Sequence, residues 1–511
     1  MKKRVKQLMA LGLAAMLVLG GCGEKEEPII VEPVEEVVET VEPEEEAEEV
    51  VEEEIVPLSV NVKTNNETYY LEGEEEAYLY LQYCDVNVNG DNYENLKRNV
   101  EKWSAERSKG LKSLYTDFQE TAEGDEQEEM FYGYSLYQTI TTARADERVL
   151  SFRDDTYQNT GGAHGMFYRE GINFDSQSGK HLGLRDVVSD WENFSTEATA
   201  CVVYYLKESY GEELFDDYVT SVEAMWAEET EPVWYFDASS IVIVIPEYLV
   251  GPYSIGTPEI HLSYVDFGHY IKDEYLPESE YCVAILQENQ ELYLKLPGIY
   301  EEVPMMLQYE WVDEVLNCSL WLGENERQLG YFDVLEDAYI VKNGTDVYCL
   351  VEVDMASDDY VTYVYRLTDG VIEEVSMIGA SIDQGNINSE EIRMESWVYL
   401  LGTYGGMKNY HFDKNRKLIT EDEEYQLLNN SYVLKTTVDL PVVLDETESI
   451  LPADSQIILT ATDGETYVKF MVQETGQAGT LYVQRGESED YHVSVNGMDE
   501  TECFEFLPYA G

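Results

Sequence analysis

Basic residues are scarce in this 511-residue sequence. It contains 32 Lys and Arg against 104 Asp and Glu, which gives a formal net charge of −72 at pH 7. Nucleic-acid binding needs a positive surface to contact the phosphates, so the composition excludes nucleic acid as a partner. Anionic lipid is disfavoured for the same reason. The charge favours a cationic partner, whose approach long-range attraction would speed, although acidity can also serve solubility alone.

The sequence also lacks the short motifs of common catalytic and metal centres. It has no Gly-x-Ser-x-Gly elbow, no P-loop, no HExxH and no His-x-x-x-His pair. Its seven cysteines form no Cys-x-x-Cys pair, so zinc-type spacing is absent, and their low density permits disulfides without demanding them. Residues 85–96 open like a calcium loop, but Leu96 stands where a bidentate Glu is needed. We therefore predict no catalytic residue, no cofactor and no metal ligand.

One histidine lies inside a glycine-rich stretch, NTGGAHG at residues 159–165. Strand-like segments at 148–157 and 166–174 flank it. A turn between two strands explains the glycines, because glycine readily adopts positive φ. No serine or cysteine nucleophile is recognisable beside His164, so we interpret this histidine as structural, hydrogen-bonded within its loop.

The N-terminus has the pattern of an export signal. A charged head of Lys and Arg precedes an apolar run from Leu8 to Leu19, which ends in Leu-Gly-Gly-Cys at Cys22. This ending is similar to the lipobox of bacterial lipoproteins, and the resemblance implies cleavage before Cys22 and lipidation of its thiol. No later stretch has the length of a transmembrane helix. We therefore expect the protein on the extracellular face of the cell membrane, held there only by a lipid anchor.

The rest of the chain changes character several times. A helix is predicted over 91–121, a strand buried on both faces over 240–246, and five short strands over 432–484 with a hairpin at Asp463-Gly464. The fold class is α+β in the N-terminal half, with antiparallel sheets and packed helices, and mainly β in the C-terminal half, where the last strands look like an SH3-like barrel. The expected segments are a signal peptide (1–22), an acidic disordered tether (23–57), two α+β domains (58–145 and 146–277), a β-rich meander domain (278–428) and an SH3-like β domain (429–511).

Two stretches resemble a known pair of domains. TGGAHGMFYREGINFDSQSGKHLGLRDVV (160–188) resembles the Gly-Gly-Ala-His core of the domain that ends the RsiV-type anti-sigma factors, and YLVGPYSIG (248–256) resembles an element near the end of that domain. Residues 60–145 occupy the place of the non-catalytic domain at the front of PdaC-type peptidoglycan deacetylases. The resemblance covers residues 60–275. It implies an extracellular α+β pair, which in RsiV-like proteins binds lysozyme.

The chain departs from both families. Its lipid anchor replaces a cytoplasmic segment and transmembrane helix, which puts sigma-factor control in doubt, and it lacks the Asp-Asp and His-x-x-x-His metal pattern of the deacetylases. We therefore expect a non-catalytic lipoprotein that binds a wall-associated ligand such as peptidoglycan, or a cationic hydrolase such as a lysozyme-like basic protein. The alternative is a cell-wall polysaccharide-modifying enzyme with an unrecognised active site. A deep cleft with converging histidines and carboxylates would favour that alternative.

The lipobox resemblance generates a direct prediction. Cys22→Ser removes the thiol that would carry the lipid, so the variant should leave the membrane fraction or accumulate as an unprocessed precursor. Cell fractionation and the intact mass of the protein measure this. An unchanged mass and membrane fraction would contradict the prediction.

Overall fold

The structure is a computed structural model. It describes residues 56–70, 78–90, 92–125, 133–161, 163–227, 230–297, 299, 301–312, 315–330, 334–355, 359–368, 370–428, 432–485 and 493–509. The chain divides into two units, Met1–Glu53 and Glu54–Gly511, and every described residue belongs to the second. Cys22 and nearly all of the expected tether therefore lie outside the described residues. Within the described ranges, no helix is both long and apolar enough to cross a membrane.

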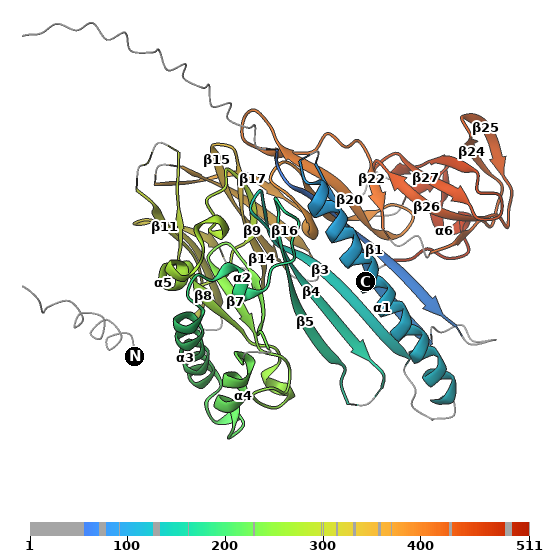
Figure 1. Ribbon diagram of the computed structural model, residues 1–511. Helices are drawn as coiled ribbons and strands as arrows, with labels where there is room; N and C mark the ends of the chain where they lie inside the picture. Colours follow the sequence, from blue (N-terminus) through green and yellow to red (C-terminus); the bar gives the residue numbers. More distant parts are fainter. Residues whose placement is uncertain are drawn as a thin grey trace, which may run out of the picture. The chain divides into compact units, whose positions relative to one another are not determined.

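One sheet has ten strands drawn from separate stretches of the chain (Figure 1). They are β1 (Ser59–Tyr69), β2 (Leu79–Asn89), β3 (Tyr134–Asp146), β4 (Val149–Asn159), β5 (Met166–Asp175), β9 (Tyr281–Ile285), β14 (Val334–Asn343), β15 (Asp346–Asp354), β16 (Tyr360–Thr368) and β17 (Val371–Ile378). The order is β1-β2-β3-β9-β14-β15-β16-β17, and β4 and β5 branch from β3. The pairing of β2 with β3 is parallel, and the other pairings recorded for this sheet are antiparallel.

The helix predicted at 91–121 is present as α1 (Glu94–Asp125), which packs across β2 and β3 (Figure 1). Leu96, Val100 and Leu111 are buried at helical spacing and form one apolar face. Trp103 on the same helix stacks on Phe152 of β4, with ring centroids 5.8 Å apart. One apolar face of α1 therefore covers β2 and β3 of the sheet.

A second layer follows between residues 184 and 275. It contains α2 (Leu184–Val187), α3 (Trp191–Tyr210), α4 (Tyr218–Met225), β6 (Val233–Phe236), β7 (Ser240–Val244), β8 (Glu259–Ser263) and α5 (Tyr264–Phe267), with short 3₁₀ turns η2 (Gly211–Glu213), η3 (Tyr253–Ile255), η4 (Gly268–Tyr270) and η5 (Asp273–Tyr275). β7 is buried on both faces, as predicted. Ile241 and Ile243 pack with Phe194 of α3, whereas Val242 packs with Tyr339 of β14. This position between two cores explains its continuous apolar sequence.

The C-terminal half is rich in strands. A four-stranded sheet contains β10 (Leu292–Leu294), β11 (Val303–Val312), β12 (Val315–Leu322) and β13 (Asn325–Gly330). An eleven-stranded sheet contains β18 (Ser381–Ile387), β19 (Ile392–Tyr399), β20 (Thr403–Phe412), β21 (Leu418–Ile419), β22 (Tyr425–Leu427), β23 (Leu434–Lys435), β24 (Leu440–Leu444), β25 (Thr447–Leu451), β26 (Gln456–Thr462), β27 (Tyr467–Val472) and β28 (Ala478–Tyr482). The chain ends with β29 (Gln484–Arg485), β30 (Val493–Val495), β31 (Met498–Asp499) and α6 (Glu500–Cys503).

The described chain is thus mostly sheet with some helices, and its C-terminal half is mainly β, as predicted. The hairpin at Gly464 is also present, with a φ of 83° at that glycine. The expected SH3-like barrel does not close in the described residues. β26 pairs with β22, which pairs with β20, so these strands continue one open sheet that ends at β25. The boundary expected at 145 falls inside β3, and the boundary expected at 277 lies between η5 and β9.

The six cysteines in the described chain are free thiols, Cys84, Cys201, Cys282, Cys318, Cys349 and Cys503. Five of them are buried, and Cys349 lies inside β15 with the apolar side chains of its core. Burial raises the pKa of the Cys349 thiol well above its usual value. These thiols therefore act as small core residues.

Gly171 marks a close approach of two backbones and generates a stability prediction. A Cβ at this position of β5 would lie 1.7 Å from the Trp234 carbonyl oxygen of β6. Gly171→Ala should therefore lower the free energy of unfolding by about 1–3 kcal/mol, as for overpacking of a core, measured by urea denaturation. Gly379→Ala is the control, because its Cβ meets nothing within 4 Å. Equal stability of the two variants would contradict the close approach.

Candidate functional site

His164 lies where two distant segments meet. It sits in the glycine-rich turn between β4 and β5, and its ring contacts the loop that follows β7. Its Nδ1 is 2.8 Å from the Gly165 carbonyl oxygen, which can only accept, so Nδ1 carries the proton. In the neutral ring Nε2 then accepts from the Tyr248 hydroxyl at 3.1 Å. The ring also stacks on Tyr253, with centroids 3.8 Å apart and planes 16° apart.

The three rings form an exposed aromatic surface, which we call the His164 surface (His164, Tyr248 and Tyr253). Tyr248 is 43% exposed and Tyr253 is 40% exposed. Tyr248 has a φ of 62°, a left-handed conformation that is uncommon outside glycine. Glu247 holds the loop in place by accepting a hydrogen bond from the Phe167 amide at 3.1 Å. The ring hydrogen bonds of His164 are those of a structural histidine, and the surface they build is available to a partner.

A second histidine converges with a serine and a carboxylate. Asp237 Oδ2 accepts from the Ser240 hydroxyl at 2.9 Å and lies 3.1 Å from His261 Nδ1. The Ser240 hydroxyl lies 3.1 Å from the same Nδ1, so the serine and the acid meet one ring nitrogen rather than opposite ones. Proton relay needs the two groups on different nitrogens. Asp237 also accepts from the backbone amides of Ser239 and Ser240, which identifies it as the cap of the β6–β7 turn.

Burial and hydrogen bonding oppose each other at His261. Burial alone would lower its pKa, but the hydrogen bond and the charge of Asp237 outweigh burial, and the pKa lies above its usual value. This group is an anchored part of the turn, with its hydroxyl and carboxyl partners fully buried. Elsewhere in the described chain, no three or more His, Cys, Asp and Glu side chains are arranged to hold a metal ion.

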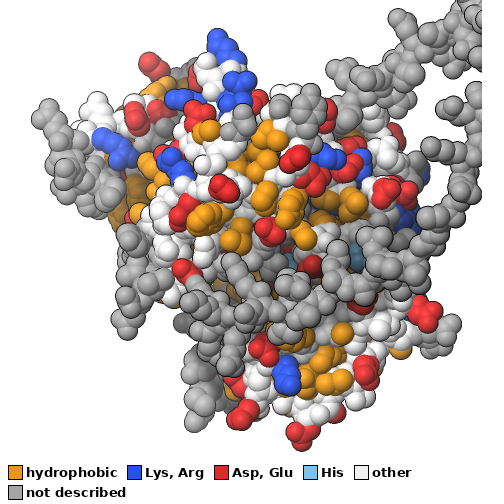
Figure 2. Space-filling model, turned by 90° about the vertical axis from the view of Figure 1, so that its left-hand side faces the viewer, with side chains coloured by type: hydrophobic (Ala, Val, Ile, Leu, Met, Phe, Trp, Pro, Cys, Tyr) orange, Lys and Arg blue, Asp and Glu red, His pale blue; other side chains and the backbone are white. Residues whose placement is uncertain are grey.

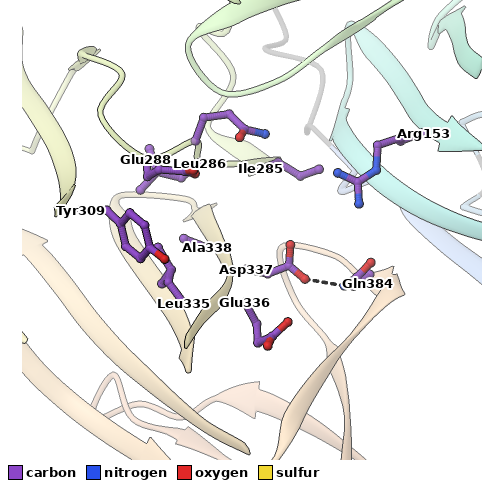
Figure 3. A pocket seen from close by; sticks show the side chains of 11 residues that line it. Arg153, Ile285, Leu286, Glu288, Tyr309, Leu335, Glu336, Asp337, Ala338 and Gln384 are labelled. Carbon is purple, nitrogen blue, oxygen red and sulfur yellow. Dashed lines mark hydrogen bonds between the residues drawn. The ribbon is translucent and has the colours of Figure 1, made fainter. Parts of the chain in front are cut away.

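A polar pocket of about 320 Å³ lies beside the central core (Figure 3). Arg153 of β4, Asp337 of β14 and Gln384 of β18 face one another in it. The Gln384 amide donates to Asp337, and its carbonyl oxygen accepts from the Thr141 hydroxyl at 2.9 Å. The eleven lining residues include no Ser, Cys, His or Lys, so the reactive groups that the pocket offers are carboxyls and the Tyr309 hydroxyl.

An ion-pair network extends from this pocket. Arg153 Nε is 3.2 Å from Asp155 Oδ2, and Asp155 is bound at both oxygens by Arg169 at 2.7 and 2.8 Å. Arg169 in turn lies 3.0 Å from Glu259, which accepts from the Tyr235 hydroxyl at 2.8 Å. The network therefore connects β4 and β5 to β6 and β8.

Two carboxyl groups near the pocket titrate close to neutral pH. Burial raises the pKa of Asp337 to about 6, although the charge of Arg153 counteracts part of that shift. Burial likewise raises the pKa of Glu352 on β15 to about 8, against a backbone hydrogen bond from Ile382 at 2.6 Å. A carboxyl that holds its proton at neutral pH can donate a hydrogen bond or a proton.

These pocket residues were not anticipated from the sequence. Glu352 carried a usable signal, because it is the one charged residue in the apolar run VYCLVEV at 347–353. Asp337 carried none, since it is one of 104 acidic residues, and the uncharged Gln384 carried none either. β14 and β18 belong to different sheets, and a tertiary contact between these two side chains brings them together, which no local spacing encodes.

Comparison with known families places two matches in the N-terminal part of the chain. The family described as deacetylase PdaC matches residues 73–167, and DUF3298, a family of proteins of unknown function, matches residues 186–265. No curated protein matches the chain. The PdaC match ends just after His164, and Tyr248 and Tyr253 lie inside the DUF3298 match. The His164 surface is therefore built jointly by the two matched regions.

Two solved structures resemble part of the chain. One is a DUF3298 family protein from Pseudomonas aeruginosa PAO1, 20% identical, with 43% of this chain and 98% of that chain covered and a TM-score of 0.33. The other is a member of the DUF3298 family from Bacteroides fragilis NCTC 9343, 20% identical, with 43% and 96% covered and a TM-score of 0.34.

The raised pKa of Glu352 generates a pH prediction. An unfolded Glu titrates near 4.3, so between about pH 4.5 and pH 8 the folded state keeps a proton that the unfolded state has released. This group therefore lowers the free energy of unfolding as pH rises through that window. Glu352→Gln removes the effect and should raise stability at pH 8 by about 1–3 kcal/mol, with a flatter pH dependence in urea denaturation.

Glu324→Gln, at an exposed position, is the matched control. It removes the same charge from the surface, so it should follow the wild-type pH dependence. If all three proteins lose stability equally between pH 5 and pH 8, Glu352 does not hold its proton in the folded state.

Proposed function

We propose that this chain is a non-catalytic lipoprotein of the bacterial cell surface, anchored through Cys22, which binds a basic protein of the lysozyme kind through the His164 surface. One observation carries the proposal. The two segments that resemble RsiV-type proteins, at 160–188 and 248–256, contribute His164 and Tyr248 with Tyr253 to one exposed cluster of rings. Aromatic side chains that are exposed yet held in place are the usual anchors of protein interfaces.

Charge supports the same partner. Residues 57–511 carry a net charge of −61. Figure 2 shows one face of the molecule, on which acidic side chains are scattered around groups of hydrophobic ones. Such charges attract a basic protein from a distance and mainly raise its association rate, whereas buried anchors mainly set the dissociation rate. The RsiV-like assignment of residues 146–277 belongs to this proposal.

The pocket at Asp337 favours a second candidate, a cell-wall polysaccharide-modifying enzyme. The observation that favours this candidate is the raised pKa of the Asp337 carboxyl, which shares the pocket with Glu288 and Glu336. Acid–base catalysis uses arrangements of this kind. Release of acetate or reducing sugar from peptidoglycan by the purified chain would favour this candidate over simple binding.

The binding proposal predicts a loss of affinity on removal of one ring. Tyr253→Ala should weaken binding of hen lysozyme at least about tenfold, because truncation of a central aromatic anchor removes more than about 1.4 kcal/mol. Calorimetric titration of residues 54–511, the compact unit of the chain, measures this. Tyr482→Ala on β28 is the matched control, since this tyrosine is 61% exposed and does not belong to the His164 surface.

Salt concentration distinguishes long-range charge attraction from direct contacts with the basic protein. At about 0.15 M salt the screening length is near 8 Å, so attraction between distant charges fades while the ring contacts remain. Wild-type binding should persist there. Loss of binding at that salt, equal binding of an unrelated basic protein, or equal effects of the two tyrosine variants would leave only a non-specific acidic surface.

A further inference from the structure

A long polar groove lies between the β1–β2 edge of the ten-stranded sheet and the face formed by β18, β19, β20 and β22. Its volume is about 1170 Å³. Nine of its 25 lining residues are Asn or Gln. Three further lining residues are cationic and four are acidic, so the groove is close to charge balance in a chain with a net charge of −72. This composition sets the groove apart from the rest of the molecule.

The base of the groove is preformed. The Asn386 side chain accepts from the Val62 amide at 2.8 Å and donates to the Val62 carbonyl oxygen at 2.9 Å, so it pairs with β1 as a strand would. Arg393 donates to the same carbonyl at 3.1 Å and to Asp383 at 2.7 Å. Because both Val62 and Asn386 are buried, these bonds fix the two walls relative to each other without an incoming ligand.

One strand supplies the line of side chains along the floor. Arg393 and Glu395 of β19 line the groove, and Trp397, two residues further along, projects from the same face of the strand and lines the neighbouring cavity. They span roughly 14 Å, at about 3.4 Å per residue. Opposite Trp397 stands Gly405, where a Cβ would lie 2.1 Å from Glu395 Oε1, so the glycine leaves room for that carboxylate.

Glu395 also connects the groove to a second hollow. It lines both the groove and a neighbouring cavity of about 530 Å³, whose walls include Trp397, Tyr399 and Tyr360. Trp397 is 41% exposed. The polar stretch of the groove thus ends at a group of aromatic rings.

The lining selects the chemistry of a ligand. Side-chain amides both donate and accept hydrogen bonds, so they suit groups that do the same, and hydroxyls are the simplest of these. Near charge balance favours an uncharged ligand. Exposed Trp and Tyr rings offer flat apolar faces with a polar edge, which suit the C–H faces of a sugar ring. A polymer of several sugar units would use both the amides and the rings.

An extended peptide fits less well. Peptides that join a sheet do so by pairing with a free strand edge. Here Asn386 already occupies the outward N–H and C=O groups of Val62 on the β1 edge. The floor of the groove is the face of a sheet, where no backbone groups are offered.

We propose that this groove binds a polysaccharide chain, with the amides and Glu395 hydrogen-bonding its hydroxyls and Trp397 stacking on a sugar ring. This inference goes beyond binding of a basic protein and uses none of the residues of the His164 surface. Failure at one site therefore leaves the other unaffected, and lysozyme titration of the Trp397 variant separates the two.

The test is calorimetric titration of the full chain with chitohexaose, cellohexaose and xylohexaose, together with a neutral Ser/Thr hexapeptide. At least one of the three oligosaccharides should bind. Trp397→Ala should weaken that binding at least tenfold. Glu395→Gln, which keeps the shape of the side chain and so keeps the fold, should weaken it at least threefold. Trp311→Ala is the control, because Trp311 is 60% exposed on β11, outside the groove.

The proposal is overturned if none of the three oligosaccharides binds at millimolar concentration. It is also overturned if the hexapeptide alone binds, or if Trp311→Ala weakens oligosaccharide binding as much as Trp397→Ala does. Retention of full affinity by Glu395→Gln and Trp397→Ala together would place the sugar elsewhere and likewise reject the groove.

Discussion

Within the ten-stranded sheet the pairing of β3 with β9 joins the N-terminal strands to the C-terminal ones, and a buried ion pair within β3 anchors the segment that leads into β9. Arg144 of β3 is fully buried and lies 2.7 Å from Asp146. Its guanidinium also donates to the Tyr275 carbonyl at 2.7 Å, just before the chain enters β9. Burying two charges is costly unless further hydrogen bonds satisfy them, and here they do: Asp146 accepts from the Val149 amide at the β3–β4 turn. The Arg144–Asp146 pair thus fixes both the β3–β4 turn and the position of the segment that leads into β9.

The position of β9 beside β3 determines the arrangement of several other elements. β9 pairs with β14, so the ten-stranded sheet continues into the C-terminal half, and β7 is enclosed between this sheet and α3. The β4–β5 hairpin then extends past β6, and its turn reaches the loop after β7, where His164 meets Tyr253. At the other edge of the same sheet, β1 meets β18 through Asn386 and closes the back of the groove. Both surfaces are consequences of how one sheet is ordered.

Local patterns predicted the local elements well. The apolar spacing of α1, the doubly buried β7 and the hairpin at Gly464 all follow from periodicity and turn chemistry, which act over a few residues. The order of strands in the sheets does not, because the pairings of β3 with β9 and of β22 with β26 depend on contacts between distant residues. That is why an SH3-like barrel was expected where an open sheet is found. Asp337 was missed because it is one of 104 acidic residues, and Gln384 because its contact with Asp337 is tertiary. The proximity of His164 to the 248–256 loop was not predicted, since resemblance to a family only assigned the two stretches to one domain.

Charge and recognition are separated in this molecule. Acidic residues dominate its composition, but the His164 surface consists of three rings, and the groove is close to charge balance with amides as its most frequent side chains. At physiological salt a charge more than about 8 Å from a ligand contributes little to a bound complex, so the excess of carboxylates acts mainly before contact. Selectivity must then come from groups that touch the ligand. Hydrogen bonds to Gly165 and Tyr248 hold the His164 ring, and hydrogen bonds to Val62 hold the Asn386 amide, so both are fixed without a ligand, which reduces the entropy lost on binding. An acidic surface therefore need not be a selective one, and both binding surfaces proposed for this chain lie where the net charge is small.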